Sequence, residues 1–141
     1  MTWLILLGIG LLICFAGVLL VGAPYVPTLT PQVKAALELA DLKSGQTLLE
    51  LGCGDGKVLI AAAQAGLKVV GYELNPVLAL IAWLRTRRYK NVQVICGNFW
   101  RADWPLAEGI FVFLHPRFMA RLDKKITQGK YNSVKLVSFA F

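Results

Sequence analysis

The hydrophobic pattern divides the chain into two parts. Residues 3–22 form an unbroken apolar run, and no charged residue or histidine occurs before Lys34. About 20 apolar residues are enough to cross the hydrocarbon core of a bilayer as a helix. After Lys34, short apolar runs alternate with segments of mixed polarity, as in an ordinary folded domain. The pattern therefore predicts a membrane anchor over residues 1–23 and one domain over residues 24–141.

A cleaved signal peptide is the main alternative for the apolar segment. Such a peptide has a basic start, an apolar stretch of roughly 7–15 residues and a small-residue cleavage site. Here only Met1 and Thr2 precede a longer run, and Pro24 follows Ala23, the best small residue. An uncleaved, single-pass anchor is therefore favoured. Because every lysine and arginine follows the run, the positive-inside rule predicts that the domain faces the cytoplasm.

Within the domain, apolar runs alternate with helix signals. Apolar runs bounded by turn residues predict strands, and proline or small-residue starts followed by apolar periodicity predict helices. The predicted strands are residues 46–51, 68–74, 92–96, 109–114 and 134–141, and the predicted helices are residues 31–41, 57–65, 75–89 and 116–128. Alternating strands and helices predict an α/β fold, with a parallel sheet covered on both faces.

Composition narrows the possible functions. The chain has 15 basic and 8 acidic residues, a net charge of +7, and a hydrophobic fraction of 57%. This composition excludes intrinsic disorder. Three cysteines exclude a disulfide scaffold and a four-cysteine metal site, and we expect no metal.

A glycine-rich loop between the first strand and the next helix carries the sharpest chemical signal. Residues 50–56 read ELGCGDG, so the glycine spacing differs from the G-x-G-x-x-G of dinucleotide-binding loops. A phosphate-binding P-loop needs Ser or Thr after Gly-Lys, but Val58 follows Lys57 here. Glu73 lies 21 residues after Gly52, at the end of the second strand, where a carboxylate accepts ribose hydroxyls.

The loop resembles the E-x-G-x-G-x-G motif of the class I S-adenosyl-L-methionine (SAM)-dependent methyltransferases. Further segments resemble one subgroup, the membrane-anchored protein-lysine methyltransferases that modify the ATP synthase c-ring protein and adenine nucleotide translocase, with their bacterial relatives. These segments are residues 24–28 (PYVPT), 71–76 (GYELNP), 97–100 (GNFW) and 112–126 (VFLHPRFMARLDKKI). The resemblance implies a Rossmann-like fold, SAM as cofactor and a lysine of a membrane protein as methyl acceptor.

The resemblance also implies a set of site residues. Those expected at the methionine end of SAM are Tyr25, Thr28, Glu50, Gly52, Cys53, Gly54, Asp55 and Gly56. Glu73 is expected to hold the ribose, and Leu74, Asn98 and Phe99 to border the adenine. The segment Leu114, His115 and Pro116 is expected to face the transferred methyl and the acceptor.

Two groups of residues have competing interpretations. His115, the only histidine, is a weak candidate for assisting proton removal, but capping the helix that opens at Pro116 is the favoured interpretation. We therefore assign no catalytic base. Trp100 and Trp104 suit the acceptor entrance, the core or a membrane interface.

A basic cluster closes the third predicted helix of the domain. It consists of Arg85, Arg87, Arg88 and Lys90. These residues suit the negative end of the helix, anionic lipid headgroups or RNA phosphates. RNA ranks last because the sequence shows no aromatic stacking platform. The predicted partners are accordingly the lipid bilayer and a membrane-protein substrate, with nucleic acid disfavoured.

The predicted sheet departs from the methyltransferase pattern in its number of strands. The class I sheet has seven strands, whereas only five are predicted here, so the sheet is expected to lack the last two. This departure keeps a non-catalytic SAM-binding or assembly module open as an alternative. A methyltransferase that acts on a small molecule, a lipid or RNA is the other alternative.

Overall fold

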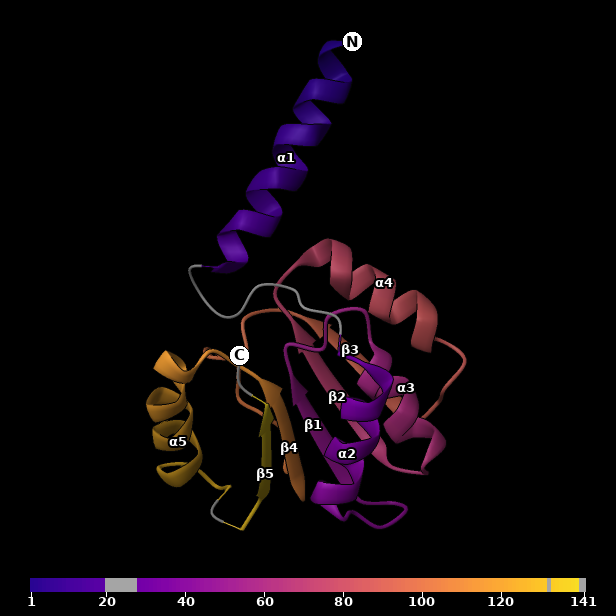
Figure 1. Cartoon of the computed structure of the whole chain (residues 1–141), viewed down its shortest axis with the longest axis vertical. Coiled ribbons are helices and arrows are strands. Elements are labelled where there is room, and N and C mark those ends of the chain that lie inside the picture. Colours follow the sequence, from indigo (N-terminus) through magenta and orange to yellow (C-terminus); the bar gives the residue numbers. More distant parts are fainter. Residues whose placement is uncertain (20–27, 132, 140–141) are drawn as a thin grey trace.

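The domain is built on a five-stranded parallel sheet. The computed structural model describes residues 1–19, 28–131 and 133–139. The strands are β1 (Thr47–Leu51), β2 (Lys68–Glu73), β3 (Val92–Cys96), β4 (Gly109–Phe113) and β5 (Lys135–Phe139), in the order β3-β2-β1-β4-β5 (Figure 1). Every neighbouring pair is parallel. The predicted Rossmann-like sheet is therefore confirmed for the described residues.

Helices cover both faces of this sheet. The helices are α2 (Thr30–Ala40), α3 (Lys57–Gln64), α4 (Pro76–Thr86) and α5 (Met119–Thr127), with a 3-10 turn, η1 (Pro116–Phe118), before α5. Side chains of α2, α3 and α4 share one hydrophobic core with the sheet, and α5 contributes to a second core on the opposite face. Figure 1 shows α5 separated from the other three helices by the strands.

Close packing between α3 and α4 depends on the residue that begins α3. Gly56 is the N-cap of α3 and has a φ of +81°, a conformation that favours glycine. A Cβ at this position would lie 3.2 Å from the backbone and the Cβ of Ala82 on α4. Ala82 is itself completely buried. Small residues at the crossing therefore bring the start of α3 against α4 and fix the glycine loop between them.

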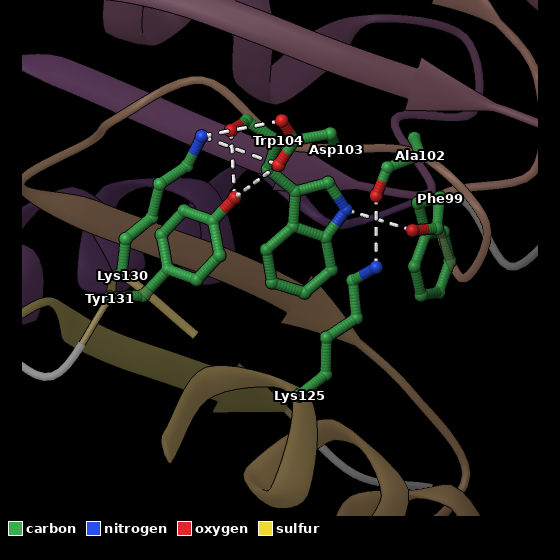
Figure 2. Close-up of polar contacts among 7 residues, drawn as sticks. All are labelled: Phe99, Ala102, Asp103, Trp104, Lys125, Lys130 and Tyr131. Carbon is green, nitrogen blue, oxygen red and sulfur yellow. Dashed lines mark hydrogen bonds and ion pairs between the residues drawn. The ribbon is translucent and has the colours of Figure 1, made fainter. Parts of the chain in front are cut away.

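The long loop between β3 and β4 covers the second face together with α5. Trp104 of this loop is buried, and its Nε1 donates a hydrogen bond to the carbonyl of Phe99 at 2.8 Å (Figure 2). Lys125 Nζ on α5 donates to the carbonyl of Ala102 at 2.9 Å, and the Tyr131 hydroxyl donates to the carbonyl of Trp104 at 2.7 Å. The loop thus acts as a packed layer rather than as an exposed connection.

The N-terminal apolar segment forms α1 (Thr2–Leu19). Its large side chains are exposed, including Trp3 and Leu12, and Figure 1 shows the helix projecting from the domain. Within the described ranges, no helix combines the length and the apolar character needed to cross a membrane. The predicted anchor continues past Leu19 into residues 20–23, which lie outside the described residues.

Candidate cofactor-binding site

The glycine loop lies at the carboxyl ends of β1 and β2. The N–H groups of Gly52 and Cys53 both donate to the carbonyl of Tyr72, at 2.8 and 2.9 Å. These bonds hold the loop against the end of β2. The chain order changes direction between β1 and its neighbours β2 and β4, which makes this edge a topological switch point. Ligands of open parallel sheets bind at such a point.

Glu73 organises the loop from the end of β2. Its side chain is buried, and Oε2 accepts the N–H of Gly54 at 2.8 Å. Oε1 accepts the N–H of Asn75 at 2.9 Å. A carboxylate offers about four acceptor positions, so each oxygen retains a position for a further donor. The arrangement fits the paired hydroxyls of a ribose.

Glu50 is a second buried carboxyl group, at the end of β1. Its Oε2 has no hydrogen-bond partner among the described residues. Burial raises the pKa of Glu50 well above its ordinary value, and the nearby charges of Glu73 and Asp55 raise it further. An unpartnered buried carboxylate is costly unless a cation or donor meets it. The ammonium or sulfonium group of SAM would supply such a partner.

Asp55 is held by a residue of α4. The Arg85 guanidinium forms an ion pair with the Asp55 carboxylate and also donates to the Asp55 carbonyl at 3.0 Å. Arg85 therefore braces the glycine loop and is separated in role from the rest of the basic cluster. This contact was not predicted from the sequence, because thirty residues separate the partners and nothing local marks the pairing.

The segment before α2 also reaches the loop. Lys57 Nζ, in the first turn of α3, donates to the carbonyl of Thr28 at 3.0 Å. Thr28 thereby lies near the start of α3, as its predicted role at the methionine end of SAM requires. Tyr25 falls outside the described residues. The cofactor contacts of Thr28 and Tyr25 stay predictions.

The residues expected around the adenine follow β2 and β3. Leu74 is half-buried directly after Glu73. Asn98 Oδ1 accepts the N–H of Trp100 at 2.9 Å, which shapes the turn after β3. Phe99 is mostly buried, with its ring centroid 4.7 Å from that of Trp100. The structure therefore gives Phe99 a packing role, and no observation tests its contact with adenine.

Three residues predicted to face the acceptor lie in different environments. Leu114 is buried in the second core, whereas His115 and Pro116 are exposed. His115 Nδ1 accepts the N–H of Arg117 at 3.3 Å and caps η1. The capping interpretation of His115 is therefore confirmed, while a part in proton removal stays a prediction.

Two further interpretations of the sequence are resolved by burial. Trp100 and Trp104 both lie in the second core, so packing is the role that the structure shows. Cys53 is also buried, and burial together with the charges of Glu50 and Glu73 raises the pKa of its thiol. A neutral, buried thiol contributes packing beside the loop.

Known proteins resemble this site and this fold together. A family model described as the ANTKMT methyltransferase domain matches residues 50–141, which include the glycine loop, Glu73 and every strand from β2 onward. The chain belongs to the ANTKMT methyltransferase family. The resemblance inferred from the glycine loop and the flanking segments is thereby confirmed.

Relatives of this ANTKMT-family chain carry related names. A lysine N-methyltransferase of the ATP synthase c-ring protein, from Xenopus laevis, is 31% identical over 121 residues, covering 84% of this chain and 53% of the relative. An adenine nucleotide translocase lysine N-methyltransferase from Mus musculus is 32% identical over 122 residues, with the same coverages. The chain thus spans about half the length of these curated relatives.

A solved structure extends the comparison to a bound ligand. An RNA methyltransferase from Salinibacter ruber, in complex with S-adenosyl-L-homocysteine, is 30% identical with a TM-score of 0.67. The match covers 80% of this chain and 76% of that chain. SAM is the cofactor of this ANTKMT-family domain, as predicted. The buried Glu50 fits that cofactor, as does Glu73 with its remaining acceptor positions.

Proposed function

We propose that this chain is a membrane-anchored SAM-dependent methyltransferase that transfers a methyl group to a lysine side chain of a membrane protein. The observation that carries the proposal is the geometry around the glycine loop. Glu73 is oriented by two backbone N–H groups, and the buried Glu50 beside it has an oxygen without a partner among the described residues. Membership of the ANTKMT family and the names of the relatives support lysine as the acceptor.

The residues of the loop bind and orient rather than react. When bound, SAM supplies a methyl group activated by its sulfonium. Glu73 holds the ribose hydroxyls, the glycine loop lets the backbone approach the methionine end, and Glu50 offers its carboxylate to positive charge there. Methyl transfer is an in-line displacement, so alignment of donor and acceptor is the main contribution of the protein.

The acceptor must be a neutral amine before it attacks. Lysine has an ordinary pKa of about 10.4, and removal from water lowers the pKa of an amine. No described residue is assigned as a base, because His115 is engaged in capping η1. We infer that desolvation of the acceptor lysine, close to a membrane, favours its neutral form.

The membrane anchoring is proposed from the sequence pattern. Residues 3–22 are uncharged and apolar, and α1 presents its large side chains without covering them. With all the basic residues after this segment, the domain is expected on the cytoplasmic side of a single-pass anchor. This topology would bring the cofactor site close to lysines of other membrane proteins.

RNA is the acceptor that competes with lysine. The resemblance to the Salinibacter ruber RNA methyltransferase favours it, as does the net charge of +7. Against it, Trp100 and Trp104 are buried and so offer no exposed surface on which bases could stack. The non-catalytic alternative is less well supported because the loop and both carboxylates are in place.

An acceptor assay tests the proposal. The full chain is incubated with SAM that carries a labelled methyl group, together with membranes and total RNA from the host. We expect protease-sensitive label that mass spectrometry locates on lysine, and no label with Glu73→Ala. Label that ribonuclease removes, or that extracts with lipid, would contradict the lysine assignment and leave the methyltransferase assignment standing.

A further inference from the structure

Helix α4 leaves one side apolar and uncovered. It buries Leu78, Ala79, Ala82 and Thr86, but four large apolar side chains of the same helix are exposed. These are Leu80 (55% exposed), Ile81 (38%), Trp83 (51%) and Leu84 (46%). Residues three and four apart share a helix surface, so the four form one continuous strip, which we call the α4 face.

A shallow groove adjoins the α4 face. It has a volume of about 350 Å³ and lies between α4 and the edge strand β3. Leu80 and Trp83 line it from the helix, and Val94 and Cys96 line it from the strand. The exposed apolar surface therefore extends from the helix onto the edge of the sheet.

Positive charge surrounds the α4 face. Between Glu73 and Asp103 the sequence holds five basic residues and no acidic one. Arg85 is paired with Asp55, but Arg87, Arg88 and Lys90 are exposed just beyond the carboxyl end of α4. An exposed tryptophan among leucines, with arginine and lysine at the border, is typical of a helix that lies in a membrane interface.

We propose that the α4 face docks on the surface of an anionic lipid bilayer. Leu80, Ile81, Trp83 and Leu84 enter the interface, while Arg87, Arg88 and Lys90 contact lipid headgroups. Figure 1 shows α4 on the side of the domain from which the apolar helix α1 projects, so both reach one bilayer. The inference adds to the proposed anchoring and does not require methyl transfer.

Docking would set the height of the cofactor site above the bilayer. Helix α4 begins at Pro76, three residues after Glu73, and its 11 residues span about 16 Å. A docked α4 would therefore hold Glu73 and the glycine loop within about one helix length of the lipid surface. This orientation selects acceptor lysines that lie near the headgroups rather than those far from the membrane.

A site-specific fluorescent label tests the docking. Leu84→Cys, with Cys14→Ser and Cys96→Ser in the background, is labelled with a polarity-sensitive dye. The matched control is Leu39→Cys, since Leu39 is an exposed leucine on α2. The full chain is reconstituted into vesicles of phosphatidylcholine, with or without phosphatidylglycerol. We expect a blue shift of the label at position 84 in the anionic vesicles, and none at position 39.

A charge variant adds a quantitative readout. At about fivefold per basic residue near an anionic surface, Arg87→Gln, Arg88→Gln and Lys90→Gln together should weaken docking on the order of 100-fold. The blue shift should then disappear although the protein still floats with the vesicles. Flotation reports the anchor, and binding of S-adenosylhomocysteine reports the cofactor site, so these proposals fail separately.

Two results would overturn the proposal. An unchanged spectrum at position 84 in anionic vesicles would show that the α4 face stays in water, whether or not the protein floats. A blue shift already present without vesicles would show that α1 or a second copy of the chain covers this face.

Discussion

Glu50 and Glu73 lie at the carboxyl ends of neighbouring strands but in different hydrogen-bonding environments. Glu73 accepts two backbone N–H groups and so orders the loop in the absence of any ligand. Glu50 has an oxygen without a partner among the described residues and a raised pKa, so its ionised form is disfavoured until a positive group arrives. One carboxylate therefore shapes the site, and the other gives it a preference for a cationic ligand.

Glu73→Ala should abolish measurable binding of S-adenosylhomocysteine. The loss of charge-assisted hydrogen bonds to the ribose is expected to weaken binding by more than about 100-fold. Isothermal titration calorimetry measures the affinity. The matched control is Glu108→Ala, because the Glu108 carboxylate also accepts a backbone N–H, from Thr47 at 2.7 Å, at the opposite edge of the sheet. Equal affinities for the two variants would contradict the ribose assignment.

Glu50→Gln should raise the melting temperature of the ligand-free protein at about pH 8. Because the pKa of Glu50 is higher in the folded state than in the unfolded state, ionisation opposes folding, and stability falls as the pH rises above about 4.3. The advantage of the variant should shrink as the pH falls toward that value, where Glu50 is protonated in the folded state and increasingly in the unfolded state. Thermal unfolding at mildly acidic and mildly alkaline pH, followed by circular dichroism, measures it. A variant whose advantage over the parent does not grow with pH would contradict the cause given for Glu50.

At the scale of elements, the crossing of α3 and α4 holds the glycine loop in place. The two helices meet at Gly56 and Ala82, and Arg85 of α4 binds Asp55 in the loop. On the other face, α5 and the segment around Tyr131 hold the loop that follows β3. Both loops of the site are thus fixed by helices that pack on opposite faces of the sheet.

Gly56→Ala should destabilise the fold more than Gly52→Ala. Both glycines have a positive φ, 81° and 87°, so both variants carry a backbone cost of about 1–2 kcal/mol. Only at Gly56 does the new methyl group meet α4, whereas nothing lies within 4 Å at Gly52. Overpacking adds about 1–3 kcal/mol. Urea denaturation compares the two free energies of unfolding, and equal values would show that the α3–α4 contact is not tight.

Lys125→Met should loosen the loop between β3 and β4. The variant keeps the apolar stem but removes the donor to the carbonyls of Trp100 and Ala102, at 3.0 and 2.9 Å. An unpaired carbonyl in a part-buried position costs about 1–3 kcal/mol. Lys124→Met is the control, because Lys124 is the exposed neighbour. If urea denaturation gives the same loss for both variants, Lys125 does not hold the loop.

The elements were largely predictable, and their ends were less so. The predicted strand 92–96 agrees with β3 at both ends, because turn residues bound its apolar run. The predicted helix 116–128 instead begins as η1 and becomes α5 at Met119, since the His115 cap tightens the first turn. The predicted helix 75–89 stops at Thr86, where the Thr86 hydroxyl donates back to the Ala82 carbonyl at 2.8 Å and Tyr89 turns the chain.

The site was predictable where one motif lies on one loop, and not where distant segments meet. The spacing from Gly52 to Glu73 placed both at one edge of the sheet, and β1 and β2 do end there. Contacts such as Arg85 with Asp55 and Lys57 with Thr28 depend on how helices cross, which no local pattern encodes. The uncovered α4 face was also hidden, because a helix rich in leucine in the sequence suggests burial.

At the scale of the whole molecule, an apolar N-terminal helix is joined to a cofactor-binding sheet. The strand order β3-β2-β1-β4-β5 places the glycine loop at the switch point, and the α4 face flanks it. In the proposed function, anchor, docking face and cofactor site form one arrangement that presents SAM to acceptors at a membrane surface. That arrangement requires first of all that this chain itself binds the cofactor.

Titration of the full chain with S-adenosylhomocysteine by calorimetry, in mild detergent and with NAD as the control ligand, tests that requirement most directly. Circular dichroism of the same sample confirms that the protein is folded. We expect saturable one-site binding of S-adenosylhomocysteine and no heat with NAD. A folded protein that binds neither ligand, or that binds NAD as well as S-adenosylhomocysteine, would contradict the cofactor site described above.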